Sequence, residues 1–328
     1  AGALRLDANE GPVPLFTAET WPLAEEALRR YPDASALEAD LARRYGLPAD
    51  QVLVTAGGDD AIDRLCRMCL QGGRTLNLTV PTFSMFFHHA RLAGGRVRTV
   101  PWWEGSYPLA EMTGSIGPET GMVAVVSPNN PTGSSITEKD LLGLRKAAGD
   151  RILLLDAAYT EFADVDLTGF ALKLPRTLVL RTLSKAWGLA GLRVGYLLGP
   201  APLLAEVRAW GQPYAVAGTS LALARAALQQ DTETMPRTVA AVRDHREQIM
   251  HFLRQNGIQP LPSQANFVLC RPADAHFLVA SLAALGVSVR GWPGDDLLAG
   301  WVRLTVPADD AEFAQLMAAL AAVCQPEA

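Results

Sequence analysis

Short apolar runs alternate with helix-length segments between Gln51 and Pro200, and this alternation constrains the fold more than any other feature of the chain. The runs are rich in Val, Leu, Ile and Thr, and they lie at 52–55, 75–80, 97–100, 122–126, 152–155, 177–180 and 194–198. Strands that are apolar on both sides need cover on both faces, which helices packed on a mostly parallel sheet provide. The pattern therefore predicts a large α/β domain.

The pattern changes after Tyr214. A long helical stretch over Leu221–Gln255 comes first, and shorter segments of both kinds follow it. We expect strands at 267–269, 287–289 and 302–306, and helices near 273–285 and 308–323. This mixture predicts a second, smaller α+β domain. The length of 328 residues agrees with two domains of roughly 150 residues each.

The composition excludes several classes of protein. With 19% charged residues and a net charge of −5, the chain lacks the basic excess of a nucleic-acid binder. Its apolar runs are far shorter than the roughly 20 residues of a membrane helix, and its N-terminus lacks a signal-peptide pattern. We therefore expect a cytoplasmic protein with no nucleic-acid or membrane partner, although the chain begins without Met.

The cysteines and histidines give no metal-binding pattern. Cys66 and Cys69 form a C-x-x-C on a predicted helix, without a second pair or clustered histidines nearby. The five histidines are scattered along the chain. Structural zinc sites need four suitably spaced ligands, so we expect no metal and interpret the two thiols as core residues.

Lys185 is one of only four lysines among 29 lysine and arginine residues. Arginine can replace lysine wherever only surface charge is needed, but a guanidinium cannot lose its proton and attack a carbonyl. Lys139 and Lys146 lie on a polar predicted helix and Lys173 lies beside a loop proline, so these three are interpreted as solvated charges. Lys185 instead follows a strand-like run and is surrounded by small and apolar residues. It is therefore predicted to be a Schiff-base lysine.

Three further motifs accompany this lysine. Ser127-Pro-Asn-Asn-Pro-Thr-Gly133 and Leu155-Asp-Ala-Ala-Tyr159 precede it, and Arg193 follows Ser184-Lys185 at short range. Each motif alone is common, since Asn-Pro-Thr-Gly is an ordinary turn sequence. In this order and approximate spacing, however, they resemble the fold-type I pyridoxal-phosphate aminotransferases. The resemblance implies that family's α/β fold, its cofactor pyridoxal 5′-phosphate, and an amino donor and a 2-oxo acid as substrates.

Within that group the chain is most similar to histidinol-phosphate aminotransferases, over nearly its whole length. The similar segments are 7–12, 30–33, 55–60, 81–83, 184–193, 266–269 and 302–306. The resemblance implies an N-terminal arm, residues 1–20, that packs with the small domain. It also implies a large cofactor-binding domain over 21–218, a small domain over 219–328, and a homodimer.

The resemblance assigns roles around the cofactor ring. Lys185 would hold the cofactor and move the proton, and Asp156 would keep the ring nitrogen protonated, which requires a carboxylate of lower pKa than the pyridinium. Asn130 and Tyr159 would donate to the phenolic oxygen of the ring. Phe83 stands where the subfamily usually has Tyr, and it would stack on the ring through its π face.

Other residues are assigned to the cofactor phosphate. Gly57-Gly58-Asp59 lies between a predicted strand and a predicted helix, where backbone N–H groups would point at an anion. The resemblance adds the hydroxyl of Ser184 and the guanidinium of Arg193. It also assigns Tyr31 to the phosphate site of the neighbouring subunit, so the active unit would be a dimer.

The substrate site is assigned to Arg303, which would bind the anionic group of each substrate, with Arg290 and Asn9 assisting. The subfamily usually has Asn-Glu-Asn-Pro-Tyr in the N-terminal arm, where the Tyr helps to bind the donor's phosphate. This chain has Val13 at the position of that Tyr. We therefore expect histidinol phosphate to bind more weakly than in a typical member, and aromatic or apolar amino acids to compete better.

Two alternatives to a histidinol-phosphate type aminotransferase that uses 2-oxoglutarate stay open at this point. Threonine-phosphate decarboxylases are related pyridoxal lyases that share these cofactor motifs. A non-catalytic pyridoxal-binding sensor domain is the second alternative. It is disfavoured because the chain keeps both Lys185 and Asp156 and has no basic DNA-binding segment.

Overall fold

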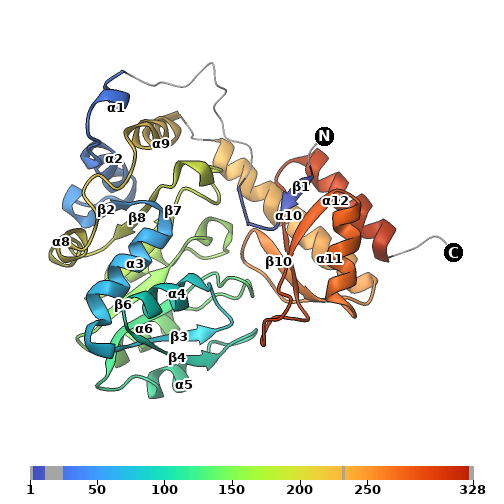
Figure 1. Ribbon diagram of the computed structural model, residues 1–328, viewed down its shortest axis with the longest axis horizontal. Helices are drawn as coiled ribbons and strands as arrows, with labels where there is room; N and C mark the ends of the chain where they lie inside the picture. Colours follow the sequence, from blue (N-terminus) through green and yellow to red (C-terminus); the bar gives the residue numbers. More distant parts are fainter. Residues whose placement is uncertain (1–2, 12–24, 231–232, 325–328) are drawn as a thin grey trace.

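The computed structural model describes residues 3–11, 25–230 and 233–324. Two sheets organise it, each with its own helices, and they lie side by side in Figure 1; the larger sheet has a core on each face and the smaller sheet has one core. In the picture the larger sheet and its helices run from blue through green to gold, and the smaller sheet and its helices are orange to red except for one blue strand from the N-terminal segment. The predicted pair of an α/β domain and a smaller mixed domain is confirmed.

The large sheet has seven strands in the order β2-β8-β7-β6-β5-β3-β4. Strand β8 runs antiparallel to both of its neighbours, and every other pair in this sheet is parallel. The strands are β2 (Val52–Thr55), β3 (Thr75–Val80), β4 (Arg96–Pro101), β5 (Thr120–Val126), β6 (Ile152–Asp156), β7 (Thr177–Thr182) and β8 (Gly195–Leu198). Each predicted strand is present, with bounds shifted by at most two residues.

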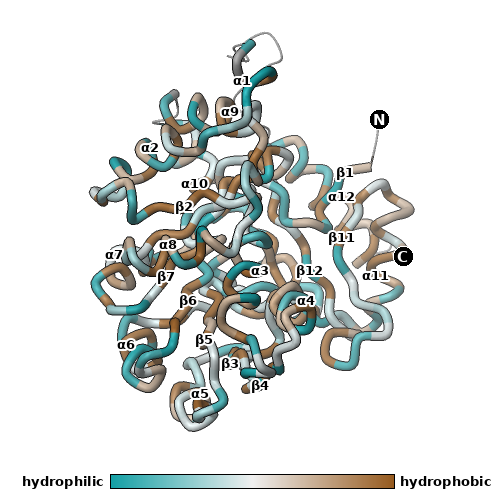
Figure 2. The backbone as a smooth tube through the Cα atoms, turned by 60° about the vertical axis from the view of Figure 1, so that its left-hand side comes forward, coloured by the Kyte–Doolittle hydropathy of each residue, from teal (hydrophilic) through white to brown (hydrophobic). Residues whose placement is uncertain are grey.

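Helices cover both faces of this sheet, because its central strands are apolar on both sides. On β6, Leu153 and Leu155 join one core and Ile152 and Leu154 join the other, as the alternation of a strand requires. The first core includes residues of α2 (Ser35–Tyr45), α6 (Glu138–Ala148) and α9 (Gly218–Gln230); the second includes residues of α3 (Gly57–Cys69), α4 (Met85–Leu92) and α8 (Ala201–Ala209). Short helices α1 (Glu26–Arg29), α5 (Leu109–Gly114) and α7 (Thr168–Ala171) complete this part. Figure 2 shows hydrophobic and hydrophilic residues alternating along these helices.

The small sheet has five strands in the order β1-β11-β12-β10-β9. Its edge strand β1 comes from the N-terminal segment and pairs in parallel with β11, from Leu4 opposite Val287 to Leu6 opposite Val289. The elements of this part are β1 (Leu4–Leu6), α10 (Thr234–Gln255), β9 (Gln259–Pro260), β10 (Phe267–Arg271), α11 (Ala275–Ala284), β11 (Val287–Gly291), β12 (Val302–Thr305) and α12 (Asp310–Cys324). The three helices share a core with the sheet.

The prediction of one helical stretch over Leu221–Gln255 is wrong. The structure has two helices there, and Glu233, just before α10, is not helical. Helix α9 packs against α1 and α2 and places Leu221 and Ala224 in the core of the large sheet. We therefore place α9 with the large domain, and a boundary after α9 fits this packing better than the predicted one between residues 218 and 219.

Within the described part of the chain, no helix is both long and apolar enough to cross a membrane. The cytoplasmic location stays a prediction.

Candidate active site

One cavity gathers most of the residues predicted to bind the cofactor. Its lining includes the predicted residues Gly58, Asp59, Phe83, Asn130, Asp156, Tyr159, Ser184, Lys185 and Arg193. The sequence analysis did not single out the other lining residues, which are Ile62, Val126, Ala158, Leu180 and Thr182. Segments that are far apart in the sequence therefore meet at one place.

The topology of the large sheet explains this meeting. Asp156 is the last residue of β6, Asn130 follows β5, Phe83 follows β3, and Ser184 and Lys185 follow β7. These four strands are parallel, so their carboxyl ends lie at the same edge of the sheet. In open α/β sheets, ligands bind in the crevice outside that edge.

Asp156 is a buried carboxylate in the lining of the cavity. Its Oδ1 accepts a hydrogen bond of 3.1 Å from the backbone N–H of Ala158. The pKa of Asp156 is raised to about 7, mainly by burial and to a smaller extent by the charge of Asp59, while the Ala158 hydrogen bond and Lys185 oppose the shift. A carboxylate with so little solvation is stabilised by a cation placed next to it, such as a protonated ring nitrogen.

Tyr159 and Asn130 form a polar wall of the cavity. The Tyr159 hydroxyl oxygen accepts from the side-chain amides of Asn130 at 3.3 Å and Asn9 at 3.2 Å. A phenol has one proton and two acceptor sites, so the Tyr159 O–H is left as a donor. The Asn130 Oδ1 accepts from Arg303 Nη1 at 2.7 Å, which fixes the Asn130 amide with its NH₂ towards Tyr159. This wall can donate to an oxygen on a bound ring.

The amine of Lys185 lies at the border between the cavity and the N-terminal segment. Its Nζ donates to the carbonyl of Ala8 at 3.4 Å and lies 5.6 Å from the centre of the Tyr159 ring. The N-terminal segment crosses directly over the lysine loop at Gly11, where a β-carbon would lie 1.9 Å from the Lys185 carbonyl oxygen. Only glycine fits at that position while the backbones keep this approach.

The other end of the cavity is suited to an anion. The first turn of α3 begins at Gly57, and its unpaired backbone N–H groups and helix dipole favour negative charge. Arg193 has a left-handed backbone and pairs with Asp59 at 3.2 Å. A β-carbon on Gly57 would lie 2.7 Å from Arg193 Nη2, so this glycine makes room for the guanidinium. Ser184 adds a hydroxyl, held 3.0 Å from that of Thr182.

Arg303 lies outside this lining but is attached to it. The guanidinium is buried, and it bonds Asn130 through Nη1 and the Asp7 carbonyl, at 2.8 Å, through Nη2. Its Cζ lies 5.4 Å from the Phe267 ring and 5.8 Å from the Trp292 ring. Burial lowers the pKa of Arg303 to about 10, so the side chain stays charged at neutral pH. The buried Nε has no hydrogen-bond partner within the described residues, which suits a site for an anion.

The structure places the remaining predicted residues as follows. Arg290 is exposed, lies opposite Arg303 in the β11–β12 pair, and holds its guanidinium 5.7 Å from the Trp292 ring. Asn9 is buried beside Tyr159. Tyr31 is 81% exposed, does not line this cavity, and stacks on Tyr214 with ring centres 4.6 Å apart. Val13 lies outside the described residues.

Sequence reasoning missed the contribution of the N-terminal backbone. The carbonyls of Asp7 and Ala8 bond Arg303 and Lys185, and Thr305 bonds both Asn9 and the Leu6 carbonyl. Backbone carbonyls carry no residue-specific signal, so no motif could have located them. The strand-end position of Thr182, two residues before Ser184, was the one available clue to its place in the lining.

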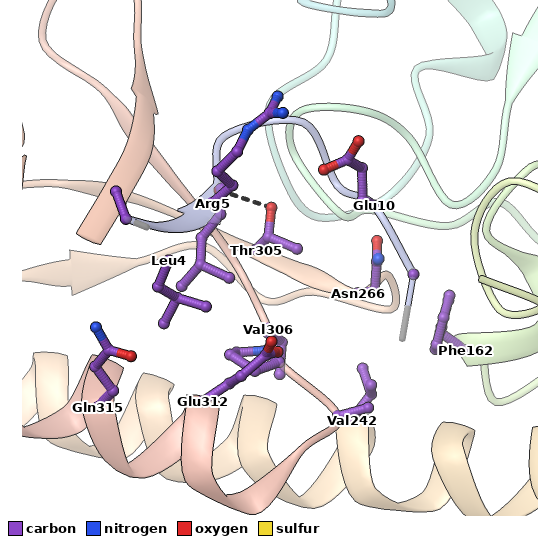
Figure 3. Close-up of a pocket in the computed structure, with 15 residues that line it drawn as sticks. Leu4, Arg5, Glu10, Phe162, Val242, Asn266, Thr305, Val306, Glu312 and Gln315 are labelled. Atoms are coloured by element: carbon purple, nitrogen blue, oxygen red, sulfur yellow. Dashed lines mark hydrogen bonds between the residues drawn. The ribbon is translucent and has the colours of Figure 1, made fainter. Parts of the chain in front are cut away.

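A second cavity, of about 430 Å³, lies beneath the N-terminal segment (Figure 3). Its walls come from β1, from α12 and from the residues around Asn266 and Thr305. A hydrogen bond of 2.7 Å from the Thr305 hydroxyl to the Leu6 carbonyl joins the N-terminal strand β1 above this cavity to β12. Among the described residues that line it there is no lysine and none of the predicted cofactor residues, so the first cavity remains the candidate cofactor site.

Comparison with known proteins decides the family. A model of the family "Aminotransferase class I and II" matches residues 1–320. The chain is a class I and II aminotransferase. Such enzymes move an amino group between an amino donor and a 2-oxo acid with pyridoxal 5′-phosphate as cofactor, and the predicted enzyme class and cofactor are thereby confirmed.

Three similar proteins are informative about this aminotransferase. It is 33% identical to "Histidinol-phosphate aminotransferase 2" of Nitrosospira multiformis, over 88% of this chain and 76% of that protein. It is 35% identical to a histidinol-phosphate aminotransferase of Xanthomonas euvesicatoria, over 86% of this chain and 81% of that protein. The crystal structure of histidinol-phosphate aminotransferase from Sinorhizobium meliloti in complex with pyridoxal-5′-phosphate matches with a TM-score of 0.85 and 27% identity, covering 99% and 92% of the two chains. The predicted fold-type I fold is therefore confirmed.

The cavity of this aminotransferase fits the cofactor. It combines one amine, one buried carboxylate that forms no ion pair among the described residues, two donors beside each other, an aromatic ring and an anion-binding helix end. In the same order, these groups suit the parts of the cofactor: its amine-reactive aldehyde, its pyridinium nitrogen, its phenolate oxygen, its flat ring and its phosphate.

The raised pKa of Asp156 predicts how the stability of the cofactor-free protein depends on pH. Between 3.8, the ordinary value, and about 7, the folded state binds more protons than the unfolded state. The free energy of unfolding therefore falls as pH rises through that window. Asp156→Asn should match the wild type near pH 4 and be more stable near pH 8, by an amount on the order of a few kcal/mol.

Urea unfolding of the cofactor-free proteins at both pH values measures this difference. Asp150→Asn, which changes an exposed carboxylate, should leave the pH dependence as it is in the wild type. An Asp156→Asn protein with the wild-type pH dependence would show that Asp156 titrates normally.

Proposed function

We propose that this aminotransferase moves an amino group between 2-oxoglutarate and a donor of the histidinol-phosphate type, with aromatic or apolar amino acids as competing donors. The observation that carries the proposal is the buried guanidinium of Arg303, held 2.7 Å from the cofactor-wall residue Asn130. It is supported by the relatives named histidinol-phosphate aminotransferases at 33% and 35% identity.

Lys185 and Asp156 carry the proton chemistry in this proposal. The cofactor, when bound, supplies an electron sink that stabilises negative charge on the substrate carbon. Lys185 holds the cofactor through its amine. When the amine of the donor takes that place, Lys185 becomes a free base in a half-buried position and moves the proton away from the substrate Cα. The Asp156 carboxylate stabilises the positive charge of the ring nitrogen through the reaction.

Asn130 and Tyr159 position and polarise the ring from the other side. Their N–H and O–H groups are already fixed by hydrogen bonds to Arg303 and Asn9, so they need little reorganisation when the ring oxygen becomes negative. Phe83 covers one face of the ring. The phosphate is held by the first turn of α3, Ser184 and Arg193.

Arg303 binds the anionic group of each substrate in turn. A planar guanidinium fits the carboxylate of glutamate and the phosphate of histidinol phosphate equally well, because both accept two parallel hydrogen bonds. The exposed Arg290 adds positive charge on the same face of the small sheet. The missing phosphate contact at Val13 should weaken a phosphorylated donor by about 1.5 to 3 kcal/mol.

Tyr31 supports a homodimer in this proposal. Its ring and that of Tyr214 are exposed in the single chain, at 81% and 61%. Two stacked aromatic rings that are exposed to water form an apolar surface of the kind found at protein interfaces, and a second copy of the chain would bury them. The proposed role of Tyr31 in the partner's phosphate site fits this position.

A half-reaction screen tests the donor. Histidinol phosphate, phenylalanine, leucine or O-phosphothreonine is added alone to the cofactor-loaded enzyme, and the cofactor spectrum is followed. Histidinol phosphate should convert the cofactor to its amine form at high concentration, and at least one aromatic or apolar amino acid should do so as well. Lys185→Ala should give no conversion with any of them.

Two results would contradict parts of this proposal. If histidinol phosphate gave no conversion at any concentration while another amino acid reacted readily, the donor type would be wrong. Release of carbon dioxide from O-phosphothreonine, without conversion of the cofactor, would favour the decarboxylase alternative instead.

The proposed role of Arg303 predicts a large effect of its removal on both half-reactions. Arg303→Ala should lower kcat/KM for glutamate and for histidinol phosphate by about a hundredfold or more, because a buried charge partner of the substrate is lost. Arg290→Ala, which removes an exposed charge, should cost only a fewfold. Steady-state kinetics with each substrate measures both variants. If Arg290→Ala lowered kcat/KM as much as Arg303→Ala does, this role of Arg303 would be wrong.

Subunit mixing tests Tyr31. Lys185→Ala should be inactive, and Tyr31→Ala should be inactive when the cofactor is limiting. If Tyr31 serves the neighbouring site, each hybrid dimer contains one site with both residues intact, and mixing should restore activity. No recovery despite verified subunit exchange would mean that each site uses the Tyr31 of its own chain, or none.

A further inference from the structure

Strand β12 turns one row of side chains towards the large domain. Val302 and Leu304 are fully buried in the core of the small domain, so the alternation of the strand directs residues 301, 303 and 305 to the opposite side. Arg303 on that side bonds Asn130, and Thr305 bonds Asn9. These two contacts belong to the site described above.

Trp301, the remaining member of this row, makes a contact that the site does not explain. Its ring stacks on Trp103 with ring centres 5.0 Å apart and an interplanar angle of 22°. Trp103 belongs to the large domain, where it lies two residues after the end of β4, and its carbonyl accepts from the Ser134 hydroxyl at 3.1 Å. The guanidinium of Arg271 lies 5.8 Å from the Trp301 ring. Trp301 therefore ties the start of β12 to the large domain.

We propose that the Trp103–Trp301 stack is a clamp that positions Arg303 for the substrate anion. Trp301 and Arg303 are two residues apart on one side of one strand, so a shift of the first displaces the second. The clamp makes Trp301 and Trp103 positioning residues for substrate binding. The inference rests on the proposed role of Arg303.

The contacts of Arg303 explain why it needs this support. Its two hydrogen bonds go to Asn130 of the large domain and to the Asp7 carbonyl of the N-terminal segment. A substrate anion that pairs with Nη2 and with the Nε, which has no partner among the described residues, would compete with the Asp7 carbonyl, so binding would weaken the link between Arg303 and the N-terminal segment. The aromatic stack lies outside this exchange and holds the domains in place while it occurs. A misplacement of about 1 Å is enough to cost two orders of magnitude in a catalytic site.

Kinetics with 2-oxoglutarate tests the clamp. Trp301→Ala and Trp103→Ala should each raise the KM for 2-oxoglutarate by about two- to tenfold, the range expected when an aromatic pair is lost. The kcat at saturation should change less than KM, and Trp301→Phe, which keeps a stacking ring, should restore most of the affinity. Trp210→Ala removes a half-buried tryptophan from the end of α8 and is the matched control.

Circular dichroism gives a readout that does not depend on activity. Two stacked indoles couple their transitions and produce a paired positive and negative band, which should vanish in Trp103→Phe and in Trp301→Phe and persist in Trp210→Ala. The double variant Trp103→Ala/Trp301→Ala should raise KM no more than either single variant, because the two residues act as one unit.

Arg303→Ala, measured in the same assay, separates the two proposals. If Arg303→Ala raises the KM while both tryptophan variants leave it unchanged, the clamp is overturned and the role of Arg303 stands. If Arg303→Ala leaves the KM unchanged, the role of Arg303 is wrong and the clamp falls with it. Strictly additive effects of the two tryptophan substitutions would also overturn the clamp.

Discussion

The hydrogen bond from Arg303 to Asn130 joins the two domains at the point where chemistry is proposed to occur. Arg303 comes from the small sheet, and Asn130 comes from the carboxyl edge of the large sheet. In the proposed function neither residue would act without the other domain, because the buried Arg303 guanidinium orients the Asn130 amide through this bond. The active site is therefore a property of how the domains are joined, and each contact between them affects it.

Burial shifts the charged groups on the two sides of the site in opposite directions. It raises the pKa of Asp156 to about 7 and lowers that of Arg303 to about 10, for the same reason: both side chains have lost water. Each is a charge that is stabilised by a ligand of opposite sign. In the proposed function, the cationic ring nitrogen of the cofactor would pair with Asp156, and an anionic substrate would pair with Arg303. Because the Asp156 carboxylate and the Arg303 guanidinium have lost water in the folded protein, ligands of opposite charge would bind to them more strongly.

The large sheet and its cavity could be predicted because their signals are local. Buried parallel strands are uniformly apolar, Asp156 ends one of them and Lys185 lies shortly after another, and the resemblance to aminotransferases assigned these residues their roles. The break between α9 and α10 was missed because helix-forming residues continue on both sides of it, and only packing against different cores separates the two helices. The contact of Trp301 with Trp103 joins residues almost 200 positions apart, and no periodicity in the sequence links them. The carbonyls of Asp7 and Ala8 could not be predicted, because any residue could supply them.

The use of backbone rather than side chains in the N-terminal segment has a consequence for how this protein can vary. At positions 7 and 8 the site takes carbonyl oxygens, which every amino acid carries, so many substitutions there would leave the contacts with Arg303 and Lys185 in place. Positions 9 and 11 are different: Asn9 supplies an amide from a left-handed backbone, and Gly11 has no space for a β-carbon. The backbone path of this segment is therefore required by the site, whereas the side chains at positions 7 and 8 are not. We expect homologous chains to differ more at positions 7 and 8, which contribute only backbone carbonyls, than at positions 9 and 11.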